Sequence, residues 1–371
     1  MALSHINQYD RERRIRISLL SLNTHHPTMQ HSSIPIAVGI DVAKATLSVC
    51  FRSHEGAEIA LTFRNIEAEI NKKLITCLNG FTGKIVLEAT SYYHWLVTLL
   101  LTEAGYQVYV VNPLLAKQYT TGNIRKVKTD PADAASLARM AAIADNLPPA
   151  FQETRATLAI KRKLSCIARL TNQIQSLRGM LNQLKESHDI LDIPLSKGEK
   201  ALHKTLQTLC KQKKVLEQET IQGPQPIEVV HLDTIPGVTP FVAKACLTYF
   251  NYRPDQTVKS WIGFAGLDVS SRESGVWKGR CKLTKRGNNF LRHRLFSAAW
   301  GAVMTNADFK SYYTMLRLQG RSHVESLLIV ARRIVRIMFK VVEQNRSYDS
   351  SRMILSKKEA IPIQLFTPIT C

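Results

Sequence analysis

The sequence predicts an α/β domain followed by two mainly helical regions. Strand-like and helix-like segments alternate over 34–150, which favours a mixed sheet covered by helices. Apolar residues then recur at three- and four-residue steps over 151–222, as expected for long amphipathic helices. Helix-forming segments with a glycine-containing turn fill 223–371. A chain of 371 residues is long enough for several such domains.

The α/β region begins with three successive strand-like segments, IPIAVGID, TLSVCFRS and EIALTFRN, which we expect to form a meander. A polar helix is expected over 66–78, followed by a strand in KIVLEAT. An apolar helix over 93–105 and a strand over 106–113 then complete the predicted layer of sheet and helices.

The helical middle is predicted to be an antiparallel pair of helices, over 158–186 and 200–220. The seam of the first helix comprises Leu164, Ile167, Leu170, Ile174, Leu177, Leu181 and Leu184. This spacing is typical of a coiled coil. Because such helical pairs often mediate dimerisation, we expect a homo-oligomer, either a dimer or a tetramer.

The last region is predicted to be a mainly helical domain ending in a helix over 324–342. Its segment TIPGVTP lies between two apolar stretches and resembles the turn of a helix-hairpin-helix. The glycine-containing turn of that motif offers backbone N–H groups to phosphate.

The charge of the chain indicates a polyanionic partner. There are 50 lysines and arginines against 29 acidic residues, a net charge of +21. Nucleic acid is the partner that this balance favours, and a membrane surface is the weaker alternative. No apolar run is long enough to span a bilayer. We expect residues 1–33 to form a basic disordered extension.

The seven cysteines are scattered and never in CxxC spacing, which predicts neither a zinc site nor a disulfide framework. A reducing cytoplasm fits this pattern.

Four acidic residues are the candidate metal ligands. Asp41 lies in GIDVAK and Glu88 closes the strand-like run KIVLE, whereas Asp130 and Asp133 open the helix-like segment DPADAASLARMA. An acid at the end of a buried strand is costly unless it is paired or binds a cation. Several acids brought together would make an oxygen-rich site for Mg²⁺. The order strand-Asp, strand-Glu, helix-DxxD is the layout of an RNase H-like nuclease core.

Each acid also has a purely structural interpretation. Asp41 could cap a turn and Glu88 could form an ion pair at a strand end. Asp130 could be the N-cap of a helix that has Pro131 at its first position and Asp133 complementing the helix dipole.

A basic, glycine-bearing segment over 271–294 is the candidate nucleic-acid interface. Its candidate phosphate-binding residues are Arg272, Lys278, Arg280, Lys282, Lys285, Arg286 and Arg292. Flexible loops dense in arginine and lysine suit a nucleic-acid backbone, although a solvated basic surface is the simpler alternative. Ser274, followed by Gly275, could attack phosphorus if a base or metal activates it, or it could be an ordinary turn residue.

The motifs GIDVAK, VLEAT, VNP, KTDPADA, TIPGV and FAGL…SGVWKGRCKLTKRGNNFLR occur in this order over about residues 36–300. In these motifs the chain resembles the DEDD transposases of the insertion sequence one-ten family. The combination of KTDPADA with a downstream SG…KRG is specific, whereas GIDVAK alone is weak.

The resemblance implies a RuvC-like RNase H domain that holds Mg²⁺ through Asp41, Glu88, Asp130 and Asp133. It also implies a C-terminal transposase domain with a nucleophilic serine, for which Ser274 matches the family position. The partners implied are donor DNA, target DNA and a bridge RNA, in the bacterial cytoplasm at the nucleoid. The family segment before the serine often reads PRxxSSG, whereas this chain reads DVSSRESG. Ser270 and Ser271 therefore remain competing positions.

The predicted reaction is attack of Ser274 on a DNA phosphodiester to give a covalent phosphoserine and a free 3′-OH. The acids and the serine come from different domains, so the active site could be composite, completed between protomers. One alternative is a Mg²⁺-dependent nuclease or resolvase that uses water. Another is a non-catalytic nucleic-acid-binding or architectural protein.

Overall fold

The computed structural model describes residues 35–120, 129–270, 273–274, 277–278 and 282–352. Contacts within the chain divide it into two compact units, Met1–Leu158 and Ala159–Cys371. The basic extension expected over 1–33 lies outside the described residues.

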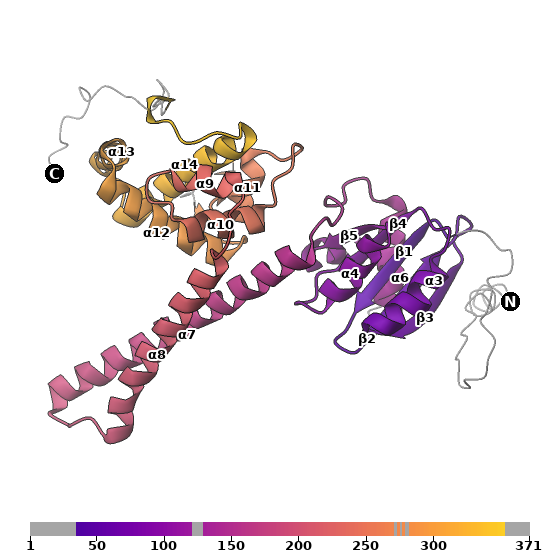
Figure 1. The fold of residues 1–371 in the computed structure, drawn as a ribbon, viewed down its shortest axis with the longest axis horizontal. Helices are drawn as coiled ribbons and strands as arrows, with labels where there is room; N and C mark the ends of the chain where they lie inside the picture. The colour runs from indigo at the N-terminus through magenta and orange to yellow at the C-terminus, as the bar shows by residue number, and fades with distance from the viewer. Residues whose placement is uncertain (1–34, 121–128, 271–272, 275–276, 279–281, 353–371) are drawn as a thin grey trace. The chain divides into compact units, whose positions relative to one another are not determined.

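A five-stranded mixed sheet forms the centre of the first unit, in the order β3-β2-β1-β4-β5 (Figure 1). Its strands are β1 (Ala37–Val42), β2 (Thr46–Arg52), β3 (Glu58–Arg64), β4 (Lys84–Glu88) and β5 (Gln107–Val111). The first three strands pair antiparallel, whereas β4 runs parallel to both β1 and β5. The predicted meander and the RNase H-like α/β fold are both confirmed.

Helices cover both faces of this sheet. They are α2 (Glu67–Glu69), η1 (Ile70–Leu74), α3 (Ile75–Cys77), α4 (His94–Glu103), α5 (Pro113–Thr120) and α6 (Asp130–Ile143). On one face, Leu74 and Leu101 pack in a single core with Ile40 and Leu87 of the central strands. The helix α5 was not predicted, because Pro113 fits the end of a strand equally well.

The opposite face of the sheet is covered by α6. Its side chains Leu137 and Met140 share a core with Ala37 of β1 and Val86 of β4. Alternate residues of a strand point to opposite faces, so each of these strands contributes to both cores. The two cores explain why β1 and β4 read as nearly continuous apolar runs.

A half-buried ion-pair network also ties α6 to the edge of the meander. Arg139 of α6 donates from Nε and Nη2 to the two carboxylate oxygens of Glu58 in β3, at 2.8 and 3.0 Å. Arg52 of β2 donates to the same carboxylate at 2.6 Å. Burial alone would raise the pKa of Glu58, but the two guanidinium groups hold it below its ordinary value. The network therefore attaches α6 to the edge strand β3 and restricts the direction in which the helix crosses the sheet.

The second unit begins with a long helical hairpin. Helix α7 (Arg155–Leu191) enters it, and α8 (Lys197–Thr220) runs back beside α7 (Figure 1). Four of the seven predicted seam residues are buried, Leu164, Ile167, Ile174 and Leu181, and the other three are half-buried. Ser196 and Glu199 form a capping box that starts α8. The predicted antiparallel helical pair is confirmed.

The rest of the second unit is mainly helical, as predicted. The helices are α9 (Ile227–Asp233), α10 (Pro240–Phe250), α11 (Val258–Phe264), α12 (Asn289–Thr305), α13 (Ala307–Leu318), α14 (His323–Glu343) and η2 (Ser350–Arg352). Trp261 of α11 packs edge-on against Phe339 of α14, with ring centroids 5.2 Å apart, inside one large core. None of the helices in the described ranges is long and apolar enough to cross a membrane.

The glycine of the expected helix-hairpin-helix turn serves close packing. Gly237 has a left-handed backbone, with φ of +79°, between α9 and α10. A Cβ atom there would overlap the backbone of Ala298 and lie 3.0 Å from the Cα of Ala302, both in α12. The turn is therefore held against α12, and its phosphate-binding role stays a prediction.

Candidate active site

Asp41 and Glu88 occupy equivalent positions on two adjacent strands. β1 and β4 are parallel, and their register pairs Gly39 with Val86 and Ile40 with Leu87. The next residues along each strand are Asp41 and Glu88. Because side chains alternate along a strand, Asp41 lies on the same face as Gly39, and Glu88 on the same face as Val86. Both carboxylates therefore belong to the face that α6 covers.

The helix α6 lies directly on β1 because Gly39 has no side chain. A Cβ atom at this position would overlap the backbone of Ala134 and lie 2.7 Å from the carbonyl carbon of Leu137. The first turn of α6, which carries Asp130 and Asp133, precedes this point of contact by one turn. The close packing brings these two acids toward Asp41.

The four acids form one electrostatic group. The pKa of Asp41 is raised from 3.8 to about 6, chiefly by burial and then by the negative charges of Asp130, Asp133 and Glu88. A hydrogen bond with the Val42 backbone opposes this shift. Asp130, Asp133 and Glu88 are therefore each close enough to act on Asp41, although the four residues come from three different elements.

The capping interpretation of Asp130 was wrong. The N-cap of α6 is Thr129, whose backbone is extended, and no side chain makes a capping hydrogen bond there. The backbone N–H groups of Ala132 and Asp133 instead donate to the Thr129 carbonyl oxygen, at 2.9 and 3.0 Å. The Asp130 carboxylate is thus not used to close the helix end.

Ser274 lies in the second unit, in a ribbon of short strands. They are β6 (Val269–Ser270), β7 (Glu273–Ser274), β8 (Trp277–Lys278) and β9 (Lys282–Leu283). β6 pairs antiparallel with β9, and β7 pairs antiparallel with β8, where Ser274 is the partner of Trp277. Two residues separate β6 from β7 but three separate β8 from β9, so the two ladders are offset by one residue.

The foot of this ribbon is held by a set of close contacts, which we call the ribbon base and define as Gly266, Asp268, Thr284 and Gly287. The Thr284 backbone N–H donates to the Asp268 carbonyl oxygen at 3.1 Å, and the Thr284 hydroxyl donates to the Asp268 carboxylate. A Cβ atom on Gly287 would overlap the backbone of Gly266 and lie 2.6 Å from the Gly263 carbonyl oxygen. The two chain segments that enter and leave the ribbon are therefore in direct backbone contact.

The structure describes only some of the predicted phosphate-binding residues and candidate serines. Outside the described residues lie Arg272, Arg280 and the competing Ser271. Only the backbone is described at Ser270, Ser274, Lys278 and Lys282. The described side chains are those of Lys285, Arg286 and Arg292. The first two are exposed, whereas Arg292 is half-buried and donates to Asn289 Oδ1 at 2.6 Å. Lys285 and Arg286 are therefore the accessible cations at the end of the ribbon.

Comparison with known protein families accounts for both regions of the chain. The model of the DEDD transposases of IS110 matches residues 38–186, which include all four acids. The model of the transposases of the IS116/IS110/IS902 family matches residues 230–314, which include Ser274. Together the two segments cover more than half of the chain. The chain belongs to the IS110 family of transposases.

Curated relatives support this family assignment. The chain is 23% identical over 324 residues to the pilin gene-inverting protein of Moraxella lacunata, a match that covers 84% of this chain and 97% of the relative. It is 24% identical over 153 residues to a 43.6 kDa protein of insertion element IS110 in Streptomyces coelicolor, covering 40% of this chain and 38% of that one. Among solved structures, Thermus thermophilus RuvC matches with 18% identity and a TM-score of 0.24, covering 30% of this chain and 98% of that chain.

The acids of this transposase fit a divalent cation in chemical type. Carboxylate oxygens are the ligands that Mg²⁺ prefers. The pKa of Asp41 is raised by burial and then by the neighbouring negative charges, and a bound cation would offset both effects. Within the described ranges, however, no three His, Cys, Asp or Glu side chains are arranged so that they could hold a metal ion. The acids thus form an electrostatic group but not a completed ligand set.

One residue that carries no sequence motif supports the loops around the transposase acids. Asn65, which follows β3, donates from Nδ2 to the carbonyl oxygens of Ala43 and Tyr93, at 3.1 and 3.0 Å. Ala43 follows Asp41 by two residues, and Tyr93 lies in the loop that follows Glu88. Asn65 therefore joins the two loops that leave the acid-bearing strands. A single asparagine after a strand is common, so nothing in the sequence distinguished it.

Proposed function

We propose that this transposase cuts and rejoins DNA strands by using the four acids with Mg²⁺ and Ser274 as the nucleophile. The observation that carries the first part is the electrostatic coupling of Asp41 with Asp130, Asp133 and Glu88. Carboxylates are kept close together in a half-buried site only where something offsets their repulsion, and clustered acids of raised pKa are typical of functional sites. The family assignment makes DNA the substrate.

The side chains that would hold the cation are Asp41, Glu88, Asp130 and Asp133. When bound, Mg²⁺ would stabilise negative charge on the attacking and leaving oxygens of the phosphodiester. Asp41 must lose its proton before it can act as a ligand, because a carboxylic acid is a poor ligand for a hard cation. The pKa of about 6 places that proton loss just below neutral pH.

Ser274 is proposed to attack the phosphorus atom of a DNA phosphodiester. A bond forms between Oγ and phosphorus, the bond from phosphorus to the 3′ oxygen breaks, and the serine proton is passed on so that a free 3′-OH leaves. A 3′-OH from another strand then attacks the phosphoserine, which reseals the DNA and restores the serine. The number of phosphoester bonds is conserved, so no external energy source is required.

We also propose that a bridge RNA directs the transposase to its donor and target DNA. Base pairing would then supply sequence choice, while basic side chains such as Lys285 and Arg286 hold phosphates without reading sequence. The net charge of +21 supports a protein that holds more than one nucleic acid. The α7–α8 hairpin is the proposed homo-oligomer contact, and the protein is proposed to act in the bacterial cytoplasm at the nucleoid.

The metal part of this proposal is tested by strand cleavage on donor DNA in the presence of Mg²⁺. Asp41→Asn keeps the shape of the side chain but removes its charge, and we expect cleavage to fall at least about 100-fold, in line with the removal of one catalytic electrostatic group. The control is Asp145→Asn, at an exposed acid just after α6, which should cleave like the wild type. Full cleavage by Asp41→Asn would contradict the proposal.

A further inference from the structure

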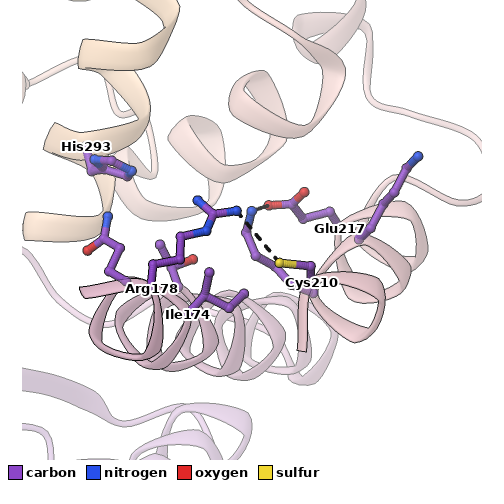
Figure 2. A pocket seen from close by; sticks show the side chains of 9 residues that line it. Ile174, Arg178, Cys210, Glu217 and His293 are labelled. Carbon is purple, nitrogen blue, oxygen red and sulfur yellow. Dashed lines mark hydrogen bonds and ion pairs between the residues drawn. The ribbon is translucent and has the colours of Figure 1, made fainter. Parts of the chain in front are cut away.

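A cleft in the second unit is lined by residues other than the four acids and the serine ribbon. It has a volume of about 430 Å³ and is bounded by α7, α8 and α12 (Figure 2). Its lining residues are Thr171, Ile174, Gln175, Arg178, Cys210, Lys213, Lys214, Glu217 and His293. All of these residues belong to the unit that begins at Ala159. The helical hairpin, expected from the sequence only to mediate oligomerisation, thus forms two walls of a concave site.

Positive charge exceeds negative charge in this cleft. Arg178, Lys213 and Lys214 line it together with a single carboxylate among the described lining residues, that of Glu217. That carboxylate is already engaged, because it lies 3.4 Å from the Lys213 ammonium and also forms an ion pair with Arg294 of α12. The lining that the structure describes therefore offers no further carboxylate to neutralise Arg178 or Lys214.

Arg178 is one of the cations of the cleft that are available to a ligand. Figure 2 shows its side chain reaching from α7 toward α8, where its Nη2 atom lies 3.9 Å from Cys210 Sγ. A thiol is a weak partner for a guanidinium group, which can donate five hydrogen bonds. The planar fork of Arg178 is suited to bidentate recognition of a phosphate.

Arg294 adds a fixed positive charge next to the cleft. Its side chain is only 16% exposed, and its guanidinium carbon stacks over Phe241 and Phe290, 4.9 and 5.2 Å from the ring centroids. Burial, followed by the charges of Arg294 and Lys213, lowers the pKa of the adjacent His293. A structure that keeps these cations together gains stability from a bound anion.

We propose that this cleft binds a phosphodiester group of a nucleic-acid backbone. The inference rests on the proposed function, in which the chain acts on nucleic acid, and adds a contact on the helical hairpin. Arg178 and Lys214 are the residues that would hold the phosphate, and Thr171 and Gln175 supply neutral hydrogen-bonding groups beside them. Contacts of this type position the strand and carry no sequence information.

The test measures binding of the full chain to labelled single-stranded RNA and to labelled duplex DNA over a series of salt concentrations. The cleft variant is Arg178→Gln/Lys214→Gln, and the matched control is Lys185→Gln/Lys204→Gln, which removes two exposed lysines from the same two helices. Loss of the one phosphate contact that the two cations hold together should make the slope of log K against log salt shallower by about 0.7 to 0.9. We expect that change, and about tenfold weaker binding at low salt, for the cleft variant only.

A shallower slope with RNA alone, with DNA alone or with both would support the proposal and would show which backbone occupies the cleft. Equal slopes for the cleft variant and the lysine control on both probes would overturn it. Asp41→Asn, measured in parallel, separates this inference from the catalytic proposal, because it should reduce cleavage at least about 100-fold and leave the salt slope unchanged. An unchanged slope in the cleft variant contradicts the cleft proposal alone. Retained cleavage by Asp41→Asn contradicts the metal proposal alone.

Discussion

Gly39 of β1 and Ala134 of α6 are in backbone contact, because a Cβ atom on Gly39 would overlap the Ala134 carbonyl oxygen. This contact sets the distance between the central strand and the helix that covers it. Asp41 lies two residues after Gly39, and Asp133 lies one residue before Ala134. The packing of a glycine against a helix backbone therefore determines how closely the acids of the two elements approach.

Replacement of Gly39 by alanine should displace α6 from the sheet. Overpacking of this kind costs about 1–3 kcal/mol, and the overlap here is with backbone, which cannot rotate away. We expect faster amide hydrogen exchange within Asp130–Ile143 and a loss of Mg²⁺-dependent cleavage. The control is Gly179→Ala, where a Cβ atom meets nothing within 4 Å, and it should leave exchange in α6 and cleavage unchanged. Native exchange rates in α6 of Gly39→Ala would argue against this role of the glycine.

The raised pKa of Asp41 predicts a specific dependence of stability on pH. The pKa is about 6 in the folded chain and 3.8 in the ordinary state, so the folded chain binds more protons between these values. In the absence of Mg²⁺, the contribution of Asp41 to the free energy of unfolding should therefore fall as pH rises from 3.8 to 6 and stay lower above it, whereas acids of lowered pKa such as Glu58 contribute in the opposite direction. Asp41→Asn should remove this fall and give a higher Tm than the wild type at pH 7.

Thermal denaturation of both proteins across this pH range, with and without Mg²⁺, measures the effect. Mg²⁺ should raise the Tm of the wild type above pH 6 and leave that of Asp41→Asn nearly unchanged. A wild type that gains stability relative to Asp41→Asn as pH rises over the same interval would show that Asp41 has the opposite shift.

Removal of the Asn65 side chain should weaken the site without unfolding the domain. Asn65→Ala removes both hydrogen bonds that join the loops after Asp41 and Glu88. Groups that orient metal ligands are typically worth about 10–100-fold in metal affinity or activity, and we expect a reduction of this size in cleavage. Raising the Mg²⁺ concentration should partly restore the rate. Asn79→Ala, at an exposed turn position of the same unit, is the control. Equal cleavage rates for the two variants would show that Asn65 does not support the acid site.

The ribbon base should matter for strand transfer more than for DNA binding. Asp268→Ala removes the carboxylate that accepts the Thr284 hydroxyl, and Gly287→Ala forces apart two backbones in contact. We expect rejoining to fall about tenfold or more in both, since small displacements of a reacting group are costly. DNA affinity, measured in the same samples, should change by less than the rate. A variant that loses binding and rejoining in equal proportion would indicate general damage to the domain.

The sequence was sufficient to predict the elements whose patterns are local. The apolar strands and the seam from Leu164 to Leu184 follow directly from residue spacing, and both were found as expected. The four acids could be named because each lies at the end or start of such an element. Their mutual approach could not be measured from the sequence, because it depends on the long-range packing of Gly39 against α6.

Other features of the fold and the site could not be predicted from the sequence, because they too depend on contacts between residues far apart in the chain. Pro113 ends a strand but also starts α5, and a proline is compatible with either role. An aspartate followed by a proline is typical of a helix N-cap, but the N-cap of α6 is Thr129 rather than Asp130. The cationic cleft joins residues from α7, α8 and α12, so no sequence window contains it. Asn65 and the pair of Gly266 and Gly287 act through contacts with distant backbone, which leave no periodic signal.

The most direct test of the central claim is a search for a covalent link between the protein and DNA. Wild type, Ser274→Ala, Ser270→Ala and Ser271→Ala would each be incubated with Mg²⁺, RNA from the flanking ends of the element and end-labelled donor and target DNA. The products would then be resolved on a denaturing protein gel. We expect a labelled protein–DNA adduct that disappears in Ser274→Ala and persists in the other two variants. Cleavage without an adduct, unaffected by Ser274→Ala, would contradict this claim and indicate that the four acids activate water instead.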